Sequence, residues 1–130
     1  MTLYTGCIYH SPHKGLRISI MSQHTLDDGI TPDPLITSAS YDQWFHFLGP
    51  PLKLIGSYYK RGLSWNDFEK EYVAYLQQEP IFGAVKRLAK IAVIHDLTFL
   101  CQEETPERCH RRLLVQECKR MNQELKIIVK

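Results

Sequence analysis

The side chains best able to do chemistry gather within residues 101–112. They comprise two thiols, an imidazole, a guanidinium and a carboxylate, which belong to Cys101, Cys109, His110, Arg111 and Glu103. Thiolates attack electrophiles, imidazoles transfer protons near neutral pH, and guanidinium groups hold phosphates and carboxylates through paired hydrogen bonds. The segment predicts a site in which Cys109, His110 and Glu103 are catalytic, while Cys101 and Arg111 bind ligand.

This segment follows an apolar run and precedes a helical pattern, so it lies where a strand ends and a helix begins. Open α/β folds bind anions at such junctions, because main-chain N–H groups and the helix dipole attract negative charge. We expect Arg111 and Arg61 to hold a phosphate and His110 to act as acid or base. The expected partner is a small anionic ligand, such as a nucleotide or a nucleic-acid end.

A structural interpretation of the same residues stays open. Arg111 would then pair with Glu103 to hold the helix against the strand, and His110 would be a partly buried histidine with its hydrogen bonds satisfied. The chain would be a non-catalytic interaction or regulatory module. A shared cavity that contains Cys109, His110, Arg111 and Glu103 would favour the enzyme or ligand-binding interpretation instead.

The cysteines allow more than one role. A helix start and nearby arginines favour the thiolate of Cys109, whereas Cys7 and Cys118 are expected to be buried and structural. Neighbouring residues on a helix do not face each other, so Cys109 and His110 make a poor nucleophile and base pair. Cys101 and Cys109 would form a disulfide if their Cα atoms came within about 7 Å.

No metal or cofactor is expected. Cys101, Cys109 and His110 lack a recognisable zinc spacing, and His10 and His13 lie across a proline in a predicted turn. The sequence thus predicts a site made of side chains alone.

Residues 97–112 resemble the signature of the domain of unknown function 488 family, in which a strand ending in Cys-x-Glu leads to Cys-His-Arg. The matching positions are Cys101, Glu103, Cys109, His110 and Arg111. Residues 59–65 are similar to a second segment of that family, and the resemblance extends loosely to Glu117. It implies an α/β fold and an activity that is undetermined.

The N-terminal half departs from this family's pattern. The usual opening is a strand with Gly-His-Ser and then a strand that ends in Asp-Val-Arg. Here the first corresponds to Tyr4-Thr5-Gly6 with His10-Ser11, and the second to residues 18–22, which lack the acid and the arginine.

The first half of the chain predicts short elements around a long loop. Apolar runs separated by a proline and glycine turn predict strands over residues 3–10 and 16–21. Residues 23–40 have little periodicity and predict a long loop, which is the candidate for a lid. Residues 41–48 predict a short helix, and residues 52–59 predict a strand.

The second half predicts helices that alternate with buried strands. Ser64 is a helix N-cap with Asp67 three positions later, and the apolar run that ends at Cys101 has the pattern of a buried strand. We expect, in order, a helix to about residue 78, a helix over 81–92, a strand over 97–101, a helix opened by Thr105-Pro106-Glu107, and a strand over 125–129.

Together these elements predict a single three-layer α/β domain over residues 1–130, with a mostly parallel sheet and a C-terminal right-handed βαβ unit. The chain has 130 residues and 44% hydrophobic content, which suits one packed core. Four cysteines without a Cys-x-x-Cys pair indicate free thiols. Neither a secretory leader nor an apolar run of ~20 residues is present, so we expect a cytoplasmic protein without a membrane partner.

The charge of the chain is nearly balanced. Its net charge is +2, and residues 60–130 carry 13 basic against 10 acidic side chains. Aromatic residues near Lys60 and Arg61 suit stacking on nucleic-acid bases, but the low basic density favours packing inside the protein. Nothing in the sequence sets the oligomeric state.

Overall fold

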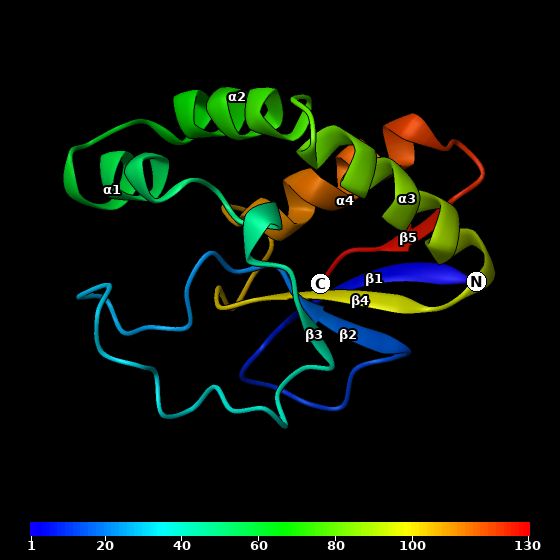
Figure 1. Cartoon of the computed structure of the whole chain (residues 1–130), viewed down its shortest axis with the longest axis horizontal. Coiled ribbons are helices and arrows are strands. Elements are labelled where there is room, and N and C mark those ends of the chain that lie inside the picture. The colour runs from blue at the N-terminus through cyan, green and yellow to red at the C-terminus, as the bar shows by residue number, and fades with distance from the viewer.

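The computed structural model describes all residues 1–130, which form a five-stranded, all-parallel sheet with helices on one side (Figure 1). The strand order is β3-β2-β4-β1-β5. The strands are β1 Thr2–Cys7, β2 Leu16–Ser19, β3 Gln43–Trp44, β4 Leu97–Cys101 and β5 Lys126–Ile128. The helices are the 3-10 helix η1 His46–Leu48 and the α-helices α1 Leu52–Lys60, α2 Trp65–Leu76, α3 Ile81–Ile94 and α4 His110–Met121.

The direction of each crossover explains the layers. Parallel crossovers are right-handed in nearly all proteins, so connections that run in opposite directions along a sheet lie on opposite faces. The chain moves from β1 through β2 to β3 in one direction, and from β3 through β4 to β5 in the other. The helices accordingly cover one face, while the loops 8–15 and 20–42 lie along the other (Figure 1).

The position of β4 creates a switch point in the sheet. It lies between β1 and β2, and the connections of these two strands leave toward the opposite face from the connection of β4. The segments that follow the carboxyl ends of these three strands therefore diverge and leave a crevice at this edge of the sheet. Open α/β sheets bind ligands in such a crevice.

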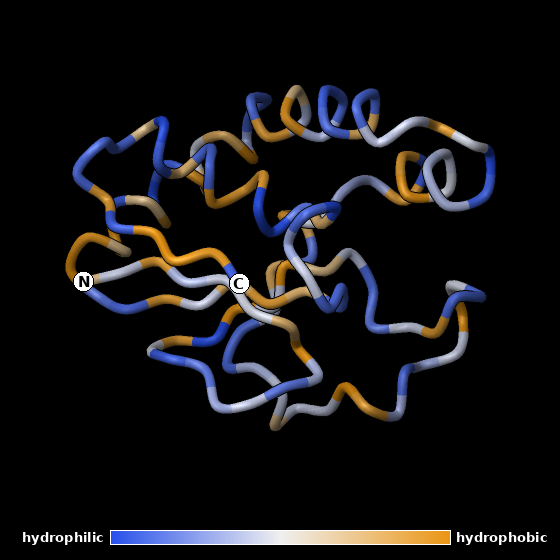
Figure 2. The backbone as a smooth tube through the Cα atoms, turned by 180° about the vertical axis from the view of Figure 1, so that it is seen from behind, coloured by the Kyte–Doolittle hydropathy of each residue, from blue (hydrophilic) through white to orange (hydrophobic).

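The main core fills the space between the sheet and the helices. Phe99 of β4, Leu114 of α4 and Val85 of α3 have no exposed surface. Hydrophobic residues concentrate in the central strands and alternate with polar ones along the helices (Figure 2). Tyr72 of α2 is also fully buried, and its hydroxyl donates to the main-chain oxygen of Leu48 at 2.5 Å. This bond joins α2 to the segment that leads into α1.

The N-cap prediction for α2 is confirmed. Ser64 has an extended backbone, with φ −66° and ψ 155°, and its hydroxyl accepts a hydrogen bond from the N–H of Asp67. The helix ends at Leu76, close to the predicted residue 78. Capping needs only residues within one turn, so the sequence is sufficient to place it.

Two elements of the first half were predicted wrongly. Residues 52–59 form helix α1 instead of a strand, and residues 41–48 hold β3 and η1 instead of a helix. In α1 the buried Leu54 and the half-buried Tyr58 lie four residues apart, which is helical spacing. In β3, pairing of Gln43 and Trp44 with β2 fixes an extended backbone that the local sequence does not signal.

The start of α4 was also predicted wrongly. The helix begins at His110, with Cys109 as its N-cap, and not at the Thr105-Pro106-Glu107 segment. The side chain of Arg112 binds the main-chain oxygens of Pro106 and Glu107, and the chain turns there without forming a helix. Cys109 therefore belongs to the turn and is buried, whereas a helix from residue 105 would have turned it elsewhere.

The predicted α/β domain with a parallel sheet is confirmed, and β4, α4 and β5 form its C-terminal βαβ unit. Of the three predicted layers, one consists of helices, one of the sheet and one of loops (Figure 1). None of the helices combines the length and the apolar character needed to cross a membrane.

Leu114→Ala tests how strongly α4 is anchored to this core. The substitution removes a fully buried side chain, so we expect the free energy of unfolding to fall by about 2–5 kcal/mol. Ile94→Ala is the control, because that side chain in α3 is 65% exposed, and it should change stability by about 0.5 kcal/mol or less. Urea unfolding followed by circular dichroism measures both; similar losses in the two variants would contradict the packing described.

Candidate functional site

A cavity of about 610 Å³ opens at the carboxyl ends of β2 and β4. Aromatic side chains form one wall and come from α1 and the start of α2: Tyr58, Tyr59, Trp65 and Phe68. Residues between Gln23 and Gly29 form the opposite wall. Cys101, Cys109 and His110 line the part of the cavity nearest the sheet. The cavity thus coincides with the switch point of the sheet.

Cys101 and His110 form a thiol and imidazole pair. Sγ of Cys101, the last residue of β4, lies 3.5 Å from Nδ1 of His110, the first residue of α4. Nε2 of His110 lies 2.7 Å from the main-chain oxygen of Ile20. A carbonyl oxygen only accepts hydrogen bonds, so Nε2 carries the hydrogen and, in the neutral ring, Nδ1 offers its lone pair to the Cys101 thiol.

Helix α2 supports the imidazole from the side. The ring of Tyr72 meets the ring of His110 edge-on, with centroids 5.5 Å apart. The main-chain oxygen of Ile20 and the ring of Tyr72 thus restrict the His110 ring on two sides, and they come from segments far apart in the sequence. The sequence carries no local signal for either contact.

Cys109 lies beside this pair in a different environment. Its side chain is buried, and Nη1 of Arg111 donates to its Sγ at 3.4 Å. Burial raises the pKa of the Cys109 thiol well above its ordinary value, and its hydrogen bond with Cys101 raises this pKa further. Cys109 was predicted as the catalytic thiol. Sγ of Cys101 is the sulfur that lies 3.5 Å from Nδ1 of His110, and the same imidazole lowers the pKa of Cys109 against the effect of burial.

Arg111 is fully buried and has no carboxylate partner. Its Nε donates to the main-chain oxygen of Lys130 at 3.0 Å, and its Nη1 to that of Glu103 at 2.6 Å. The side chain does not line the cavity. Arg111 therefore ties α4 to the turn after β4, as the structural interpretation proposed, through the main chain of Glu103 instead of its carboxylate.

The carboxylate of Glu103 lies at the cavity. It accepts a hydrogen bond from the hydroxyl of Tyr59 at 2.8 Å, and this bond links the end of β4 to α1. Burial raises the pKa of Tyr59, and the neighbouring carboxylate raises it further. Glu103 is therefore positioned to accept hydrogen bonds from a molecule in the cavity.

The cationic residues of the cavity differ from those predicted. Arg61 lies outside it, because its Nη2 folds back onto the main-chain oxygen of Lys53 and the hydroxyl of Ser57. Lys60 and Arg108 line it instead. Lys60 was missed because a strand was predicted for residues 52–59; the helical spacing in that segment was the signal that would have found it.

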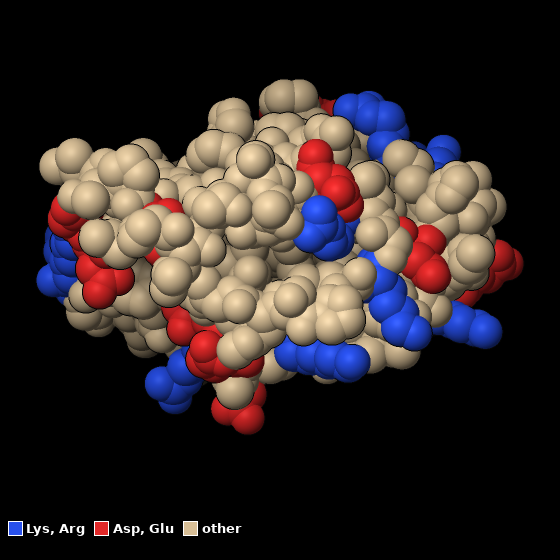
Figure 3. Space-filling model, turned by 90° about the horizontal axis from the view of Figure 1, so that it is seen from below, with Lys and Arg blue, Asp and Glu red and all other residues tan.

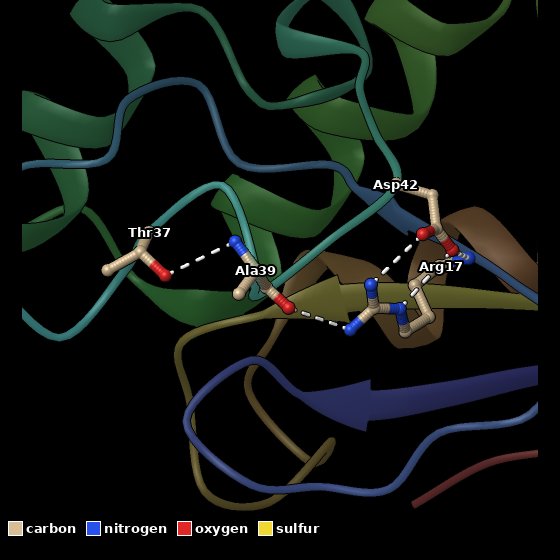
Figure 4. Close-up of polar contacts among 4 residues, drawn as sticks. All are labelled: Arg17, Thr37, Ala39 and Asp42. Atoms are coloured by element: carbon tan, nitrogen blue, oxygen red, sulfur yellow. Dashed lines mark hydrogen bonds and ion pairs between the residues drawn. The ribbon is translucent and has the colours of Figure 1, made fainter.

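The long loop is anchored at its end and forms a cavity wall. Nε and Nη2 of Arg17 on β2 bind the carboxylate of Asp42 at 3.2 and 3.0 Å, and Nη1 binds the main-chain oxygen of Ala39 at 2.9 Å (Figure 4). The bond to Arg17 lowers the pKa of Asp42. The segment predicted as a lid does line the cavity, with Leu26 and Asp27 among its contacts.

Surface charge does not indicate a nucleic-acid interface on the loop face. Figure 3 shows that face with Lys and Arg side chains interspersed among Asp and Glu, without a continuous basic stripe. The aromatic residues near Lys60 pack within the protein, as preferred from the sequence: Tyr58 contacts Trp65 edge-on, and Trp65 stacks on Phe68.

Cys101, Cys109 and His110 also offer zinc-like ligands. Their sulfur and nitrogen atoms lie within 4.8 Å of one another. The guanidinium of Arg111, however, donates to Sγ of Cys109 and has no acidic partner. This uncompensated positive charge opposes a dication, so the group suits thiol chemistry better than metal binding.

The fold and the cavity define a parallel α/β domain with a thiol and imidazole pair at the switch point of its sheet. The model of the family described as Domain of unknown function DUF488 matches residues 33–118, and the chain belongs to this family. Comparison with curated proteins and with solved structures gives no match. The matched residues include β3, α1 to α3, β4, the Cys101–His110 pair and α4 as far as residue 118, but not β1, β2 or β5.

Arg111→Lys tests the anchoring of α4. Lysine cannot reproduce the fork that reaches two main-chain oxygens and a sulfur, so buried acceptors lose their donors, and we expect a loss of about 1–3 kcal/mol in the free energy of unfolding. Arg108→Lys, at an exposed residue, serves as the control and should stay within about 0.5 kcal/mol. Equal stability of Arg111→Lys and the parent in urea would show that these bonds do not anchor the helix.

Proposed function

We propose that this chain is a cysteine-dependent enzyme that acts on a small ligand with a planar ring and an anionic group, such as a nucleotide. The observation that carries the proposal is the 3.5 Å contact between Sγ of Cys101 and Nδ1 of His110 at a cavity. A thiol and a base within hydrogen-bond reach, with the base oriented by a third group, are the elements of nucleophilic catalysis.

In the proposed reaction, Nδ1 of His110 takes the thiol proton and the Cys101 sulfur bonds to an electrophilic atom of the ligand. The leaving group departs with the electrons of the broken bond and receives the proton from His110. Water then hydrolyses the bond to sulfur and restores the thiol. The N-terminus of α4, which lies at His110, favours the negative charge of the thiolate.

The walls of the cavity favour the proposed ligand class. Aromatic faces stack on planar rings, and Tyr59, which lines the cavity and is 55% exposed, supplies one. Lys60 and Arg108 supply positive charge for an anionic group, and the Glu103 carboxylate supplies an acceptor for ring N–H groups. A volume of about 610 Å³ suits one small molecule.

A non-catalytic binding or regulatory module is the second candidate. The internal bonding of Arg111 favours it, because this member of the Cys-His-Arg motif is occupied in holding the fold together. A module of this kind needs no reactive thiol, so thiol reactivity distinguishes the two candidates.

Alkylation with iodoacetamide at pH 7.5, followed by peptide mass spectrometry, measures this reactivity. We expect Cys101 to react first, since His110 faces it and burial raises the pKa values of Cys7 and Cys109 and raises that of Cys118 to about 12. These three thiols stay protonated at pH 7.5 and should begin to react only as the pH rises toward their own pKa values.

Two variants control the alkylation experiment. His110→Asn should slow the reaction of Cys101 by on the order of tenfold or more, as expected for loss of a base. Cys118→Ser, which removes a buried thiol outside the cavity, should leave the rate unchanged. Slow alkylation of all four cysteines, or a Cys101 rate unaffected by His110→Asn, would favour the non-catalytic module.

Thermal shift with adenosine monophosphate, ribose 5-phosphate and inorganic phosphate tests the ligand class. We expect the nucleotide to raise the melting temperature most, because it alone has both a planar aromatic base and a phosphate; a ligand at 100 times its Kd adds about 2.7 kcal/mol. Lys60→Met should weaken this effect. Arg61→Met is the matched control, because the adjacent Arg61 lies outside the cavity, and an equal loss in both variants would contradict the assignment.

A further inference from the structure

A second group of metal-binding residue types lies apart from the cavity. Its members are Cys7, His10 and Glu104, called here the Cys7 cluster, and their sulfur, nitrogen and oxygen atoms lie within 4.8 Å of one another. None of the three lines the cavity. The reaction proposed above does not use this cluster.

The sheet brings these residues together. Cys7 ends β1 directly beside Cys101 of β4, so the segments that follow the two strands leave the sheet side by side. The N–H of His10 donates to the main-chain oxygen of Cys7 at 3.2 Å, in a turn that folds the histidine back. Glu104 follows β4, and its Oε2 lies 2.7 Å from Nε2 of His10.

We propose that the Cys7 cluster binds a thiophilic divalent cation, with Zn²⁺ as the best fit. Zinc takes thiolate, imidazole and carboxylate ligands in a tetrahedral shell, and three protein ligands leave the fourth position for water. The Cys-x-x-His spacing of Cys7 and His10 is short enough for both to reach one ion, while Glu104 arrives from the other strand.

Charge distinguishes this cluster from the Cys101, Cys109 and His110 group. Glu104 contributes a negative charge to the Cys7 cluster, and its Oε2 lies 2.7 Å from Nε2 of His10. The guanidinium of Arg111 contacts a sulfur of the other group directly. A dication therefore meets an acid at the Cys7 cluster and a buried cation at the other.

Binding balances protons and charge at the Cys7 cluster. The Cys7 thiol loses its proton, and His10 keeps one on Nδ1 while Nε2 binds the ion. A thiolate, a carboxylate and a dication then sum to zero. The side chains of His10 and Glu104 are 62% and 70% exposed, which gives an ion direct access from solvent.

The bound ion would join the segment after β1 to the turn after β4. This turn also carries Glu103, which lines the cavity. The ion would therefore stabilise the position of Glu103 without itself lying in the cavity. Cys7 and His10 lie outside residues 33–118, whereas Glu104 lies within them.

Cobalt titration of the full chain tests the proposal. The purified protein is treated with a chelator, dialysed under reducing conditions and titrated with Co²⁺, and Zn²⁺ is then added in competition. We expect one equivalent of Co²⁺ to give the ultraviolet absorption of a thiolate bound to cobalt, and Zn²⁺ to displace it. Absence of a thiolate band, or of bound zinc after dialysis, would overturn the proposal.

Matched variants locate the ion. His10→Asn and Glu104→Gln change exposed side chains, so they should fold and lower the affinity for Zn²⁺ by tenfold or more. Cys7→Ser should abolish the thiolate band. Cys109→Ser should leave binding unchanged; loss of binding in Cys109→Ser with retention in Cys7→Ser and His10→Asn would place the ion in the other group and refute the site.

A protection experiment separates this proposal from the proposed function. At a pH high enough for Cys7 to react with iodoacetamide, Zn²⁺ should shield Cys7 and leave the reaction of Cys101 unchanged. The two proposals therefore fail independently: a protected Cys7 with an unreactive Cys101 supports the metal site alone, while a reactive Cys101 with an unprotected Cys7 supports the enzyme alone.

Discussion

The geometry of the site depends on one buried guanidinium. Arg111 carries a charge into the interior without an acidic partner, and such burial costs several kcal/mol unless hydrogen bonds compensate it. Main-chain oxygens of Glu103 and Lys130 and the sulfur of Cys109 accept hydrogen bonds from its Nε and Nη1, while its Nη2 is buried without a hydrogen-bond partner. Because these acceptors belong to the turn after β4 and to the segment after β5, the same bonds fix where α4 begins. His110 is the first residue of α4 and directly precedes Arg111. The bonds of Arg111 therefore also fix the position of the His110 imidazole.

The order of the strands explains why the reactive residues meet there. The connections of β1 and β2 leave toward the loop face and that of β4 toward the helix face, so the carboxyl edge opens around β4. Cys101 ends β4 at this opening, and the main-chain oxygen of Ile20, just after β2, sets the tautomer of His110. The Cys101–His110 pair thus draws on β2, β4 and α4 together, although only β4 and α4 carry the sequence motif.

Two groups of potential metal ligands flank the end of β4, one at the cavity and the other the Cys7 cluster. Their electrostatic surroundings differ. The group at the cavity contains no acid and lies against the Arg111 guanidinium, which suits thiol chemistry and an anionic ligand. The Cys7 cluster includes the Glu104 carboxylate and exposed ligands, which suits a cation. Opposite local charge therefore assigns different partners to neighbouring cysteines that composition alone treats as equivalent.

The sequence by itself determined the features whose causes lie within a few residues: the Ser64 cap and the buried strand that ends at Cys101. It also identified the family, whose model matches residues 33–118. Tertiary structure decided the rest. Apolar residues 52–59 became a helix because Leu54 and Tyr58 pack on the core, and the start of α4 moved to His110 because arginine side chains bind the preceding turn. Likewise, the imidazole pairs with Cys101 because it is held by Ile20, 90 residues away. Short-range hydrogen bonds and hydrophobic periodicity depend on neighbouring residues and can be predicted from them. The contacts of α1, Arg111 and His110 depend instead on which distant segments the sheet brings together.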